Sequence, residues 1–291
     1  MERTKETLYA VVLVILALTW GSSYILMREG LKAFTPLQIA GFRIFVSWLC
    51  FLPISIHNLK FVTRKNLKSF LLIGFCGSAI PAFLFPVAQT RIESSLAGML
   101  NSLSPVFTLI IGVIFYSRKA KPVQVLGVIL GLIGALGLLY QGDLSFNHFG
   151  LFIILATFLY GISANEIGSV KGVSGFGIMS LAFFMIGPVA GLFLAFSGLP
   201  SSFGSSNWPV SLACIITLAV LGTFLANSLY SWLIIRKSPM YAISVTYLSP
   251  VVSTAWGFIL NETIRVTMII SICVILAGVY IITRSGRNGK K

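Results

Sequence analysis

Charged residues are scarce in this sequence: they make up 10% of its 291 residues, and only seven of them are acidic. A soluble domain carries roughly 25% charged residues, many of them needed on its surface. Hydrophobic residues make up 57% of the chain, and the mean hydropathy is +0.96. These values exclude a soluble enzyme, a nucleic-acid-binding domain and a disordered chain, and they predict an all-α polytopic membrane protein.

Groups that support acid–base catalysis or bind metals are also few. The two histidines, His57 and His148, fall between apolar runs, and the four cysteines lie inside such runs, where neither a loop disulfide nor a metal site is expected. Residues 161–164, Gly-Ile-Ser-Ala, loosely resemble the serine motif of intramembrane proteases but have no base beside them. The sequence lacks a His-Glu-x-x-His motif, a paired intramembrane aspartate and a P-loop. It predicts no enzyme, no cofactor and no metal, and it excludes ATP-driven pumping by this chain alone.

Ten apolar runs are long enough to cross a bilayer as helices, which takes about 20 residues each. Their length excludes membrane β-strands, which need only about 9–11 residues. The first run has no small-residue cleavage site, so we expect it to remain as the first span. The runs cover about residues 8–27, 36–56, 67–89, 96–116, 123–140, 149–167, 176–196, 210–235, 241–260 and 266–282.

The net charge is +14, and the basic residues are distributed unevenly. With ten spans, alternate connecting segments lie on opposite sides of the membrane, and one set of segments holds most of these residues. Cytoplasmic segments of membrane proteins carry the excess of Lys and Arg. We therefore expect both termini in the cytoplasm and a multi-pass protein of the bacterial inner membrane. The richer side holds sixteen basic residues, Arg3, Lys5, Lys60, Arg64, Lys65, Lys68, Arg118, Lys119, Lys121, Lys171, Arg236, Lys237, Arg284, Arg287, Lys290 and Lys291. The other side holds four, Arg28, Lys32, Arg91 and Arg265, and Arg43 lies inside a run.

Two parts of the sequence resemble each other. Residues 97–116 align without a gap on residues 242–261, with seven of 20 positions identical, including Leu-Ser-Pro-Val in both. We predict two five-span repeats, residues 1–142 and 143–291. Because each has an odd number of spans, the second enters the membrane from the opposite side. Secondary transporters use such inverted repeats to alternate access to a site near the midplane.

Pro105 and Pro250 stand at equivalent places in the middle of two runs, and each removes a backbone donor and frees a carbonyl. A structural kink and a hinge beside a substrate path both remain open for them. Arg43 lies about 10 Å inside the second run at 1.5 Å per residue. It either snorkels outward or supplies the counter-charge for an anionic group such as a carboxylate.

Other polar and aromatic residues inside the runs could line an amphipathic cavity, although each by itself is more often a helix contact or an interface aromatic. No acidic residue lies near the midplane, so a proton relay is not favoured, and uniport or exchange stays open. The candidate substrate-binding residues are Trp20, Tyr24, Arg43, Gln89, Asn101, Tyr160, Asn165, Asn227, Tyr230, Thr246 and Tyr247.

Several motifs, in order along both halves, resemble the EamA transporters of the drug/metabolite transporter superfamily. They are Trp-Gly-Ser-Ser-Tyr at 20–24, Phe-Arg at 42–43, Ser-Pro-Val-Phe at 104–107, Ser-Pro-Val-Val at 249–252 and Asn-Glu at 261–262. The resemblance covers nearly the whole chain. It implies ten helices, cytoplasmic termini, inverted repeats and a central cavity lined mainly by helices 1, 3, 4, 6, 8 and 9. Ser117, where an acidic residue is expected, and Asn261, where Gly is usual, depart from the family pattern.

We therefore expect a secondary transporter, not driven by ATP, that exports small organic metabolites such as amino acids by alternating access around a central cavity. The alternatives are a channel-like protein, a lipid scramblase, and a structural or sensory membrane component. The expected partners are a small-molecule substrate and the lipid bilayer, without nucleic acid. A homodimer is left open.

Overall fold

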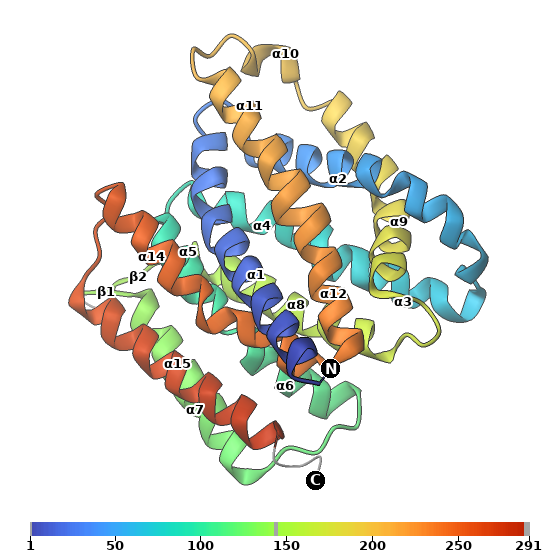
Figure 1. The fold of residues 1–291 in the computed structure, drawn as a ribbon. Coiled ribbons are helices and arrows are strands. Elements are labelled where there is room, and N and C mark those ends of the chain that lie inside the picture. Colours follow the sequence, from blue (N-terminus) through green and yellow to red (C-terminus); the bar gives the residue numbers. More distant parts are fainter. Residues whose placement is uncertain (1, 143–144, 288–291) are drawn as a thin grey trace.

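The computed structural model describes residues 2–142 and 145–287 and is a bundle of helices (Figure 1). Within these residues, ten helical segments are long and apolar enough to cross a membrane, and we number them as spans 1 to 10. The ten-span helical fold predicted from the sequence is thus confirmed. The spans are Glu6–Gly30, Pro36–Phe61, Asn66–Gln89, Ser94–Phe115, Pro122–Leu139, Gly150–Ser169, Gly175–Ala195, Trp208–Arg236, Pro239–Ile259 and Val266–Arg284.

Five spans are single α-helices, span 2 ends in a 3₁₀ turn, and spans 3, 4, 8 and 9 are divided into shorter elements. The α-helices are α1 (Glu2–Gly30), α2 (Pro36–Asn58), α3 (Arg64–Gly74), α4 (Ile80–Gln89), α5 (Ser94–Asn101), α6 (Ser104–Phe115), α7 (Pro122–Leu139), α8 (Gly150–Ser169), α9 (Gly175–Ala195), α10 (Leu199–Ser202), α11 (Trp208–Thr217), α12 (Ala226–Arg236), α13 (Pro239–Ala242), α14 (Ser249–Ile259) and α15 (Val266–Arg287). The other helical segments are the 3₁₀ turns η1 (Leu59–Phe61) and η4 (Ile243–Tyr247) and the π-helical turns η2 (Phe75–Ala79) and η3 (Leu218–Leu225).

The connection between spans 5 and 6 holds two short antiparallel strands, β1 (Tyr140–Gly142) and β2 (Ser145–Phe146). This small hairpin is an addition to the all-α fold expected from the sequence. The boundary expected between the two repeats falls beside residues 143–144, which lie outside the described residues. Lys290 and Lys291 lie outside them too, as do the side chains of Arg3, Lys5, Lys65 and Arg287.

Spans 4 and 9 break at the two prolines. Pro105 is the second residue of α6 and Pro250 the second residue of α14, positions at which a missing backbone N–H costs no helical hydrogen bond. In span 4 the carbonyl of Asn101 instead accepts a hydrogen bond from Ser104 Oγ at 2.7 Å. The prolines therefore interrupt both spans.

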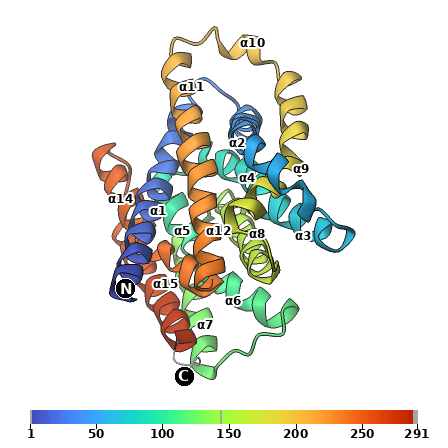
Figure 2. The same cartoon turned by 45° about the vertical axis from the view of Figure 1, so that its right-hand side comes forward.

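The helices pack closely, and α7 and α15 run side by side at one edge of the bundle (Figures 1 and 2). A Cβ at Gly127 of α7 would meet the backbone of Gly278 on α15, so only glycine permits this approach. Elsewhere α2 lies along α9. A buried cluster around Phe51, Phe70 and Phe183 holds α2, α3 and α9 together, and a second cluster surrounds α5, α7 and α15.

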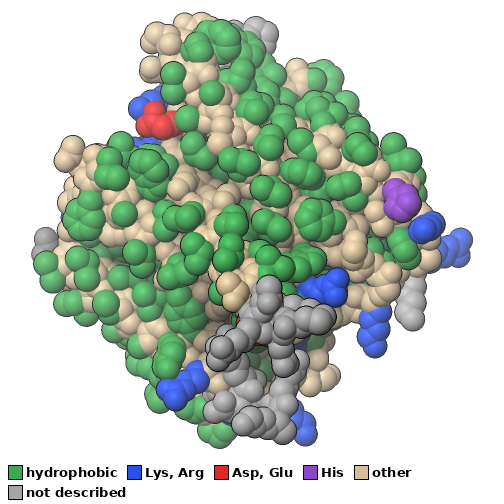
Figure 3. Space-filling model, in the orientation of Figure 1, with side chains coloured by type: hydrophobic (Ala, Val, Ile, Leu, Met, Phe, Trp, Pro, Cys, Tyr) green, Lys and Arg blue, Asp and Glu red, His purple; other side chains and the backbone are tan. Residues whose placement is uncertain are grey.

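The outer surface suits a bilayer. Figure 3 shows a face covered mainly by hydrophobic side chains, with Lys and Arg side chains toward its margins. On α7, Leu126, Ile133 and Leu136 are exposed, and on α15 so are Val266 and Ile270. Exposure of so many apolar side chains to water would be unfavourable, so these helices face lipid.

Candidate functional site

A cavity lies among the spans, in the middle of the bundle. Counted together with its opening, it measures about 920 Å³. Spans 1, 3, 4, 6, 8 and 9 all contribute to its lining, and span 2 adds Arg43 and Ile44 while span 7 adds Met179. Spans 5 and 10 contribute no described residue to it. The cavity thus lies within an eight-span shell, with α7 and α15 packed outside.

Most of the candidate residues line this one cavity. They come from six different spans, and the first and last of them are more than 220 residues apart in the sequence. Their side chains supply one cation, several amide and hydroxyl groups, and aromatic rings, which is the mixed lining of a small-molecule site. These eight residues are Trp20, Tyr24, Arg43, Asn101, Tyr160, Asn227, Tyr230 and Thr246.

Three candidate residues lie elsewhere. Gln89 Nε2 donates to the carbonyl of Tyr24 at 2.9 Å and to Ser94 Oγ at 3.0 Å, which ties α4 to α1 and α5. Asn165 Nδ2 donates to the carbonyl of Thr108 at 2.9 Å and to that of Gly161 at 2.8 Å, joining α8 to α6. The hydroxyl of Tyr247 contacts that of Thr283 on α15. All three side chains thus connect helices.

Arg43 is the one charged residue among the described residues that line the cavity. Its Nε donates to Thr223 Oγ1 at 3.3 Å, and its Nη1 lies 3.6 Å from Met27 Sδ. No described Asp or Glu lies within 4.0 Å of the guanidinium; the described ion pairs involve Arg28, Lys32 and Lys237 instead. Arg43 as a residue is half-buried, and a guanidinium with one hydroxyl and one thioether as partners retains hydrogen-bonding capacity for an anion.

The π-helical turn η3 carries the partner of Arg43. Thr223 Oγ1 also donates to the carbonyl of Leu218 at 3.1 Å, Trp20 Nε1 donates to the carbonyl of Gly222 at 3.0 Å, and Ser47 Oγ donates to that of Ala219 at 2.8 Å. Side chains from α1 and α2 therefore hold this turn in place. π-helical turns inside α-helices often occur at functional sites.

A second π-helical turn, η2, occupies the corresponding place in span 3. The offset of 145 residues that aligns Pro105 with Pro250 also aligns Gly77-Ser78 with Gly222-Thr223, and all four residues line the cavity. Ser78 is only 5% exposed, and its Oγ forms no hydrogen bond with a described residue. Sequence reasoning missed both turns, although this offset was visible in the sequence.

Aromatic rings form the apolar walls of the cavity. The ring of Trp20 meets the ring of Tyr230 edge-on, with centroids 5.1 Å apart. Phe85 lies between Tyr24 and Tyr160, at centroid distances of 5.8 and 6.0 Å. Such rings provide flat apolar surfaces, and the tyrosines add hydroxyl groups.

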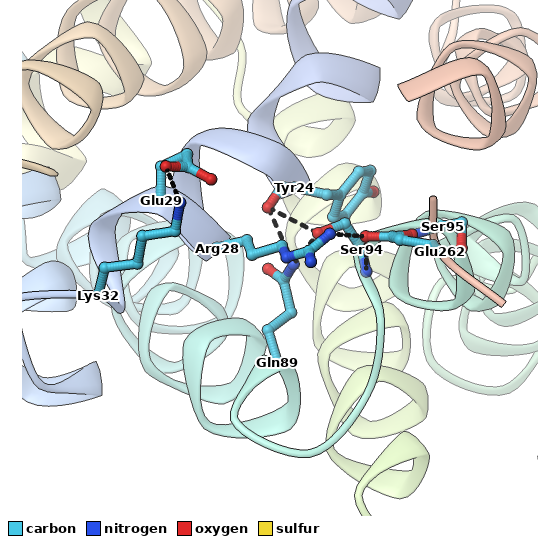
Figure 4. A network of polar contacts seen from close by, with 8 residues as sticks. All are labelled: Tyr24, Arg28, Glu29, Lys32, Gln89, Ser94, Ser95 and Glu262. Carbon is cyan, nitrogen blue, oxygen red and sulfur yellow. Dashed lines mark hydrogen bonds and ion pairs between the residues drawn. The ribbon is translucent and has the colours of Figure 1, made fainter. Parts of the chain in front are cut away.

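A polar network links helices at the end of the bundle where α1 finishes, which we call the Glu262 end (Figure 4). The carboxylate of Glu262 is fully buried and accepts hydrogen bonds from Arg28 Nη1 at 2.8 Å, Ser94 N at 3.1 Å and Ser95 N at 2.9 Å. The two backbone groups belong to the first turn of α5, where a negative charge is favoured. Glu262 thus joins the α14–α15 connection to α5 and α1.

A smaller network lies at the opposite end of the bundle, which we call the Lys237 end. There the carboxylate of Glu166 on α8 accepts hydrogen bonds from Ser69 Oγ on α3, at 2.6 Å, and from the hydroxyl of Tyr116. Burial and, after it, the bond to Glu166 raise the pKa of Tyr116, so that the phenol remains a neutral donor. Glu262 and Glu166 thus connect helices at opposite ends of the bundle.

Among the described residues, no group of three or more His, Cys, Asp or Glu side chains is placed to hold a metal ion. A ten-span helical bundle with a polar and aromatic cavity at its centre has the architecture of a membrane transporter. A sequence profile of the EamA-like transporter family matches residues 7–140 and 149–284. The chain belongs to this family and is a multi-pass membrane transporter.

Individual relatives agree with this assignment. A protein of Escherichia coli strain K12, named an uncharacterized inner membrane transporter, YedA, is 29% identical over 280 residues, which cover 93% of this chain and 89% of the relative. A protein of Salmonella typhimurium, named a probable amino-acid metabolite efflux pump, is 24% identical over 92% of each chain. A solved crystal structure matches 98% of this chain and 99% of its own, with a TM-score of 0.65 and 14% identity, a likeness that shows the fold alone.

Proposed function

We propose that this protein is a secondary transporter that exports small, partly apolar metabolites bearing a carboxylate, such as amino acids, from the cytoplasm across a bacterial inner membrane. One observation supports a substrate with a carboxylate: Arg43 lines the cavity without a carboxylate partner among the described residues. An intramembrane charge is costly unless another group balances it. A substrate carboxylate would supply that balance.

The remaining lining supports an amphipathic organic substrate. The described lining contains no Asp or Glu, so a cationic substrate would find no counter-charge there. Trp20, Phe85 and Tyr160 offer apolar surfaces for a side chain, and Asn101 and Asn227 offer amides for an amino or hydroxyl group.

We infer that transport proceeds by alternating access, through rocking of two inverted repeats, residues 1–142 and 143–291. Two features support this. Spans 4 and 9 are broken at corresponding prolines, and such broken helices surround the sites of secondary transporters. In addition, Glu262 and Glu166 connect helices at opposite ends of the bundle, where opening and closing must occur. Pro105 and Pro250 are the proposed hinges.

The direction and membrane rest on the relatives and on charge. One relative is named an inner membrane transporter and another a probable efflux pump. The described residues of the richer basic set belong to segments at the Lys237 end of the spans, so this end faces the cytoplasm in our proposal. Both termini are then cytoplasmic.

Counterflow in proteoliposomes tests the function. Vesicles loaded with one unlabelled amino acid should accumulate the labelled form, with saturation and with competition by related carboxylates. Amines that lack only the carboxylate should compete at least about tenfold less well, because hydrogen bonds to a charged group contribute about 1.5–3 kcal/mol. Flux without saturation would indicate a channel, lipid redistribution without solute flux a scramblase, and the absence of both a non-transporting component; each would overturn the proposal.

A further inference from the structure

A second groove lies at the Lys237 end of the bundle and shares no lining residue with the central cavity. It is bounded by the start of α1, the end of α12, the segment α13–η4 and the end of α15. All four elements reach the limit of a membrane span here. The groove therefore opens where the hydrocarbon of a bilayer meets its headgroups.

Two cations lie among the described residues of this groove. Lys237 Nζ stands 4.7 Å from the ring centre of Tyr9 and 5.7 Å from that of Tyr241, and it forms an ion pair with Glu6. The bond to Glu6 raises the pKa of Lys237, so this side chain remains charged. Because Glu6 offsets one of the two positive charges, the described lining of the groove keeps a net charge of about +1.

Arg284 supplies the second cation. Its Nη1 donates to the hydroxyl of Tyr280 at 2.9 Å, and the guanidinium carbon lies 5.7 Å from the ring centre of the same tyrosine. No described carboxylate forms an ion pair with it. A guanidinium has five N–H donors in a planar fork, of which this bond uses one, so Arg284 is suited to a phosphate. The hydroxyl groups of Ser244 and Thr283 line the groove beside it.

Two of the spans that bound the groove also carry exposed apolar residues in their membrane-spanning parts. Leu248 and Val251, which follow η4 in the chain, are 44% and 62% exposed. On α1, Leu8 and Val11 are 51% and 48% exposed. A molecule with an anionic head and long apolar tails matches this combination, whereas a soluble phosphate would leave the apolar part uncovered.

We propose that this groove binds the phosphate of an anionic phospholipid, with Arg284 and Lys237 at the headgroup and the acyl chains along Leu248 and Val251. The proposal is independent of the transported substrate. It does, however, place a lipid next to the transport path. In η4, Ile243 and Thr246 line the central cavity, whereas Ser244 and Tyr247 line the groove, so one short turn separates the two.

Native mass spectrometry of the full-length protein in detergent tests the proposal, with phosphatidylglycerol as the probe and phosphatidylcholine as the neutral comparison. Wild-type protein should retain phosphatidylglycerol preferentially. Replacement of both cations, Lys237→Gln with Arg284→Gln, should weaken this binding by roughly tenfold, since each basic residue near a headgroup contributes a few-fold. The matched control, Arg64→Gln with Lys68→Gln, removes two exposed charges from the start of span 3 and should leave the preference unchanged.

Two single variants separate a binding role from a structural one. Glu6→Gln removes the anion from the groove and should strengthen phosphatidylglycerol binding, an effect that loss of structure would not produce. Arg284→Gln leaves the Lys237–Glu6 pair intact and should still weaken binding. Equal loss in the groove and control variants, equal retention of the two lipids, or displacement of the lipid by millimolar glycerol phosphate would overturn the proposal; the last result would indicate a site for soluble anions.

Discussion

Arg28 and Glu262, which are 234 residues apart in the sequence, form an ion pair of 2.8 Å at one end of the transporter. The carboxylate has no exposed surface, whereas the arginine side chain is 41% exposed. Glu262 also accepts two backbone hydrogen bonds from the start of α5. One buried carboxylate therefore fixes three segments that come from the two halves of the chain.

Glu262→Gln should destabilise the protein. The amide keeps the volume of the side chain but loses the charge that Arg28 and the first turn of α5 stabilise. We expect the free energy of unfolding to fall by about 2 kcal/mol, the typical contribution of hydrogen bonds to a charged group. Thermal unfolding in detergent measures this change. Glu29→Gln, which removes the exposed pair with Lys32, should change stability by less than about 1 kcal/mol. An equal effect of the two substitutions would show that burial of Glu262 adds nothing.

Glu93 should make stability depend on pH. Burial and, secondly, the carboxylate of Glu262 raise the pKa of Glu93 in the folded protein. At neutral pH the ionised form is therefore disfavoured by folding, and Glu93→Gln should stabilise the protein. As pH falls toward the raised pKa, folded wild-type protein binds a proton before the unfolded chain does, so its stability rises and the difference disappears. Unfolding temperatures of both proteins between pH 4 and 8 check this; destabilisation by Glu93→Gln at pH 7 would contradict it.

Arg43→Gln should selectively impair substrates with a carboxylate. Loss of one member of a desolvated charge pair costs at least about 2 kcal/mol, so kcat/KM for anionic or zwitterionic substrates should fall by roughly 30-fold or more. Cationic substrates should be affected much less. Arg43→Lys should restore part of the activity because it returns the charge without the planar fork. Proteoliposome uptake measures these rates, and an equal loss for every substrate together with poor folding would refute the binding role.

Pro105→Ala and Pro250→Ala should slow exchange while the protein remains folded. Alanine restores a backbone donor and favours a continuous helix through the break, so the two halves of spans 4 and 9 should move less independently. Counterflow rates, compared with unfolding temperatures, separate the two effects. Unchanged rates in both variants would show that the prolines only shape the helices.

The breaks in the helices were predictable to different degrees. The equivalent places of Pro105 and Pro250 in the two similar segments indicated their breaks, whereas Pro53 and Pro188 lie inside uninterrupted helices. The π-helical turns at Ser78 and Thr223 have no such local signal; side chains from other spans stabilise η3, as Trp20 and Ser47 do. The positions of these side chains are set by tertiary packing.

The structure shifts the alignment of the two halves by one residue just after spans 4 and 9. The gapless alignment sets Ser117 opposite Glu262, yet Ser117 and Asn261 both have left-handed backbone conformations, with φ of 52° and 54°. One more residue separates the proline from the left-handed residue in the first half, so Arg118 stands where Glu262 stands in the second. An insertion of one residue after a helix cannot be placed from apolar sequences, because many registers fit equally well.

The sequence also does not show which polar residues inside apolar runs face the cavity. Asn101 and Asn227 face the cavity, whereas Asn165 donates to backbone carbonyls of α6 and α8, although all three are asparagines within spans. The face of a helix that meets a cavity depends on its neighbours, and sequence spacing alone does not identify those neighbours.

The sequence by itself determined that the chain crosses a membrane ten times as helices, because the lengths and polarity of the runs leave no other way to satisfy the backbone in lipid. Only the tertiary structure decided which polar groups meet, because helix rotation and register depend on packing between spans. That packing left Arg43 without a carboxylate partner among the described residues, and it buried Glu262 against the start of α5.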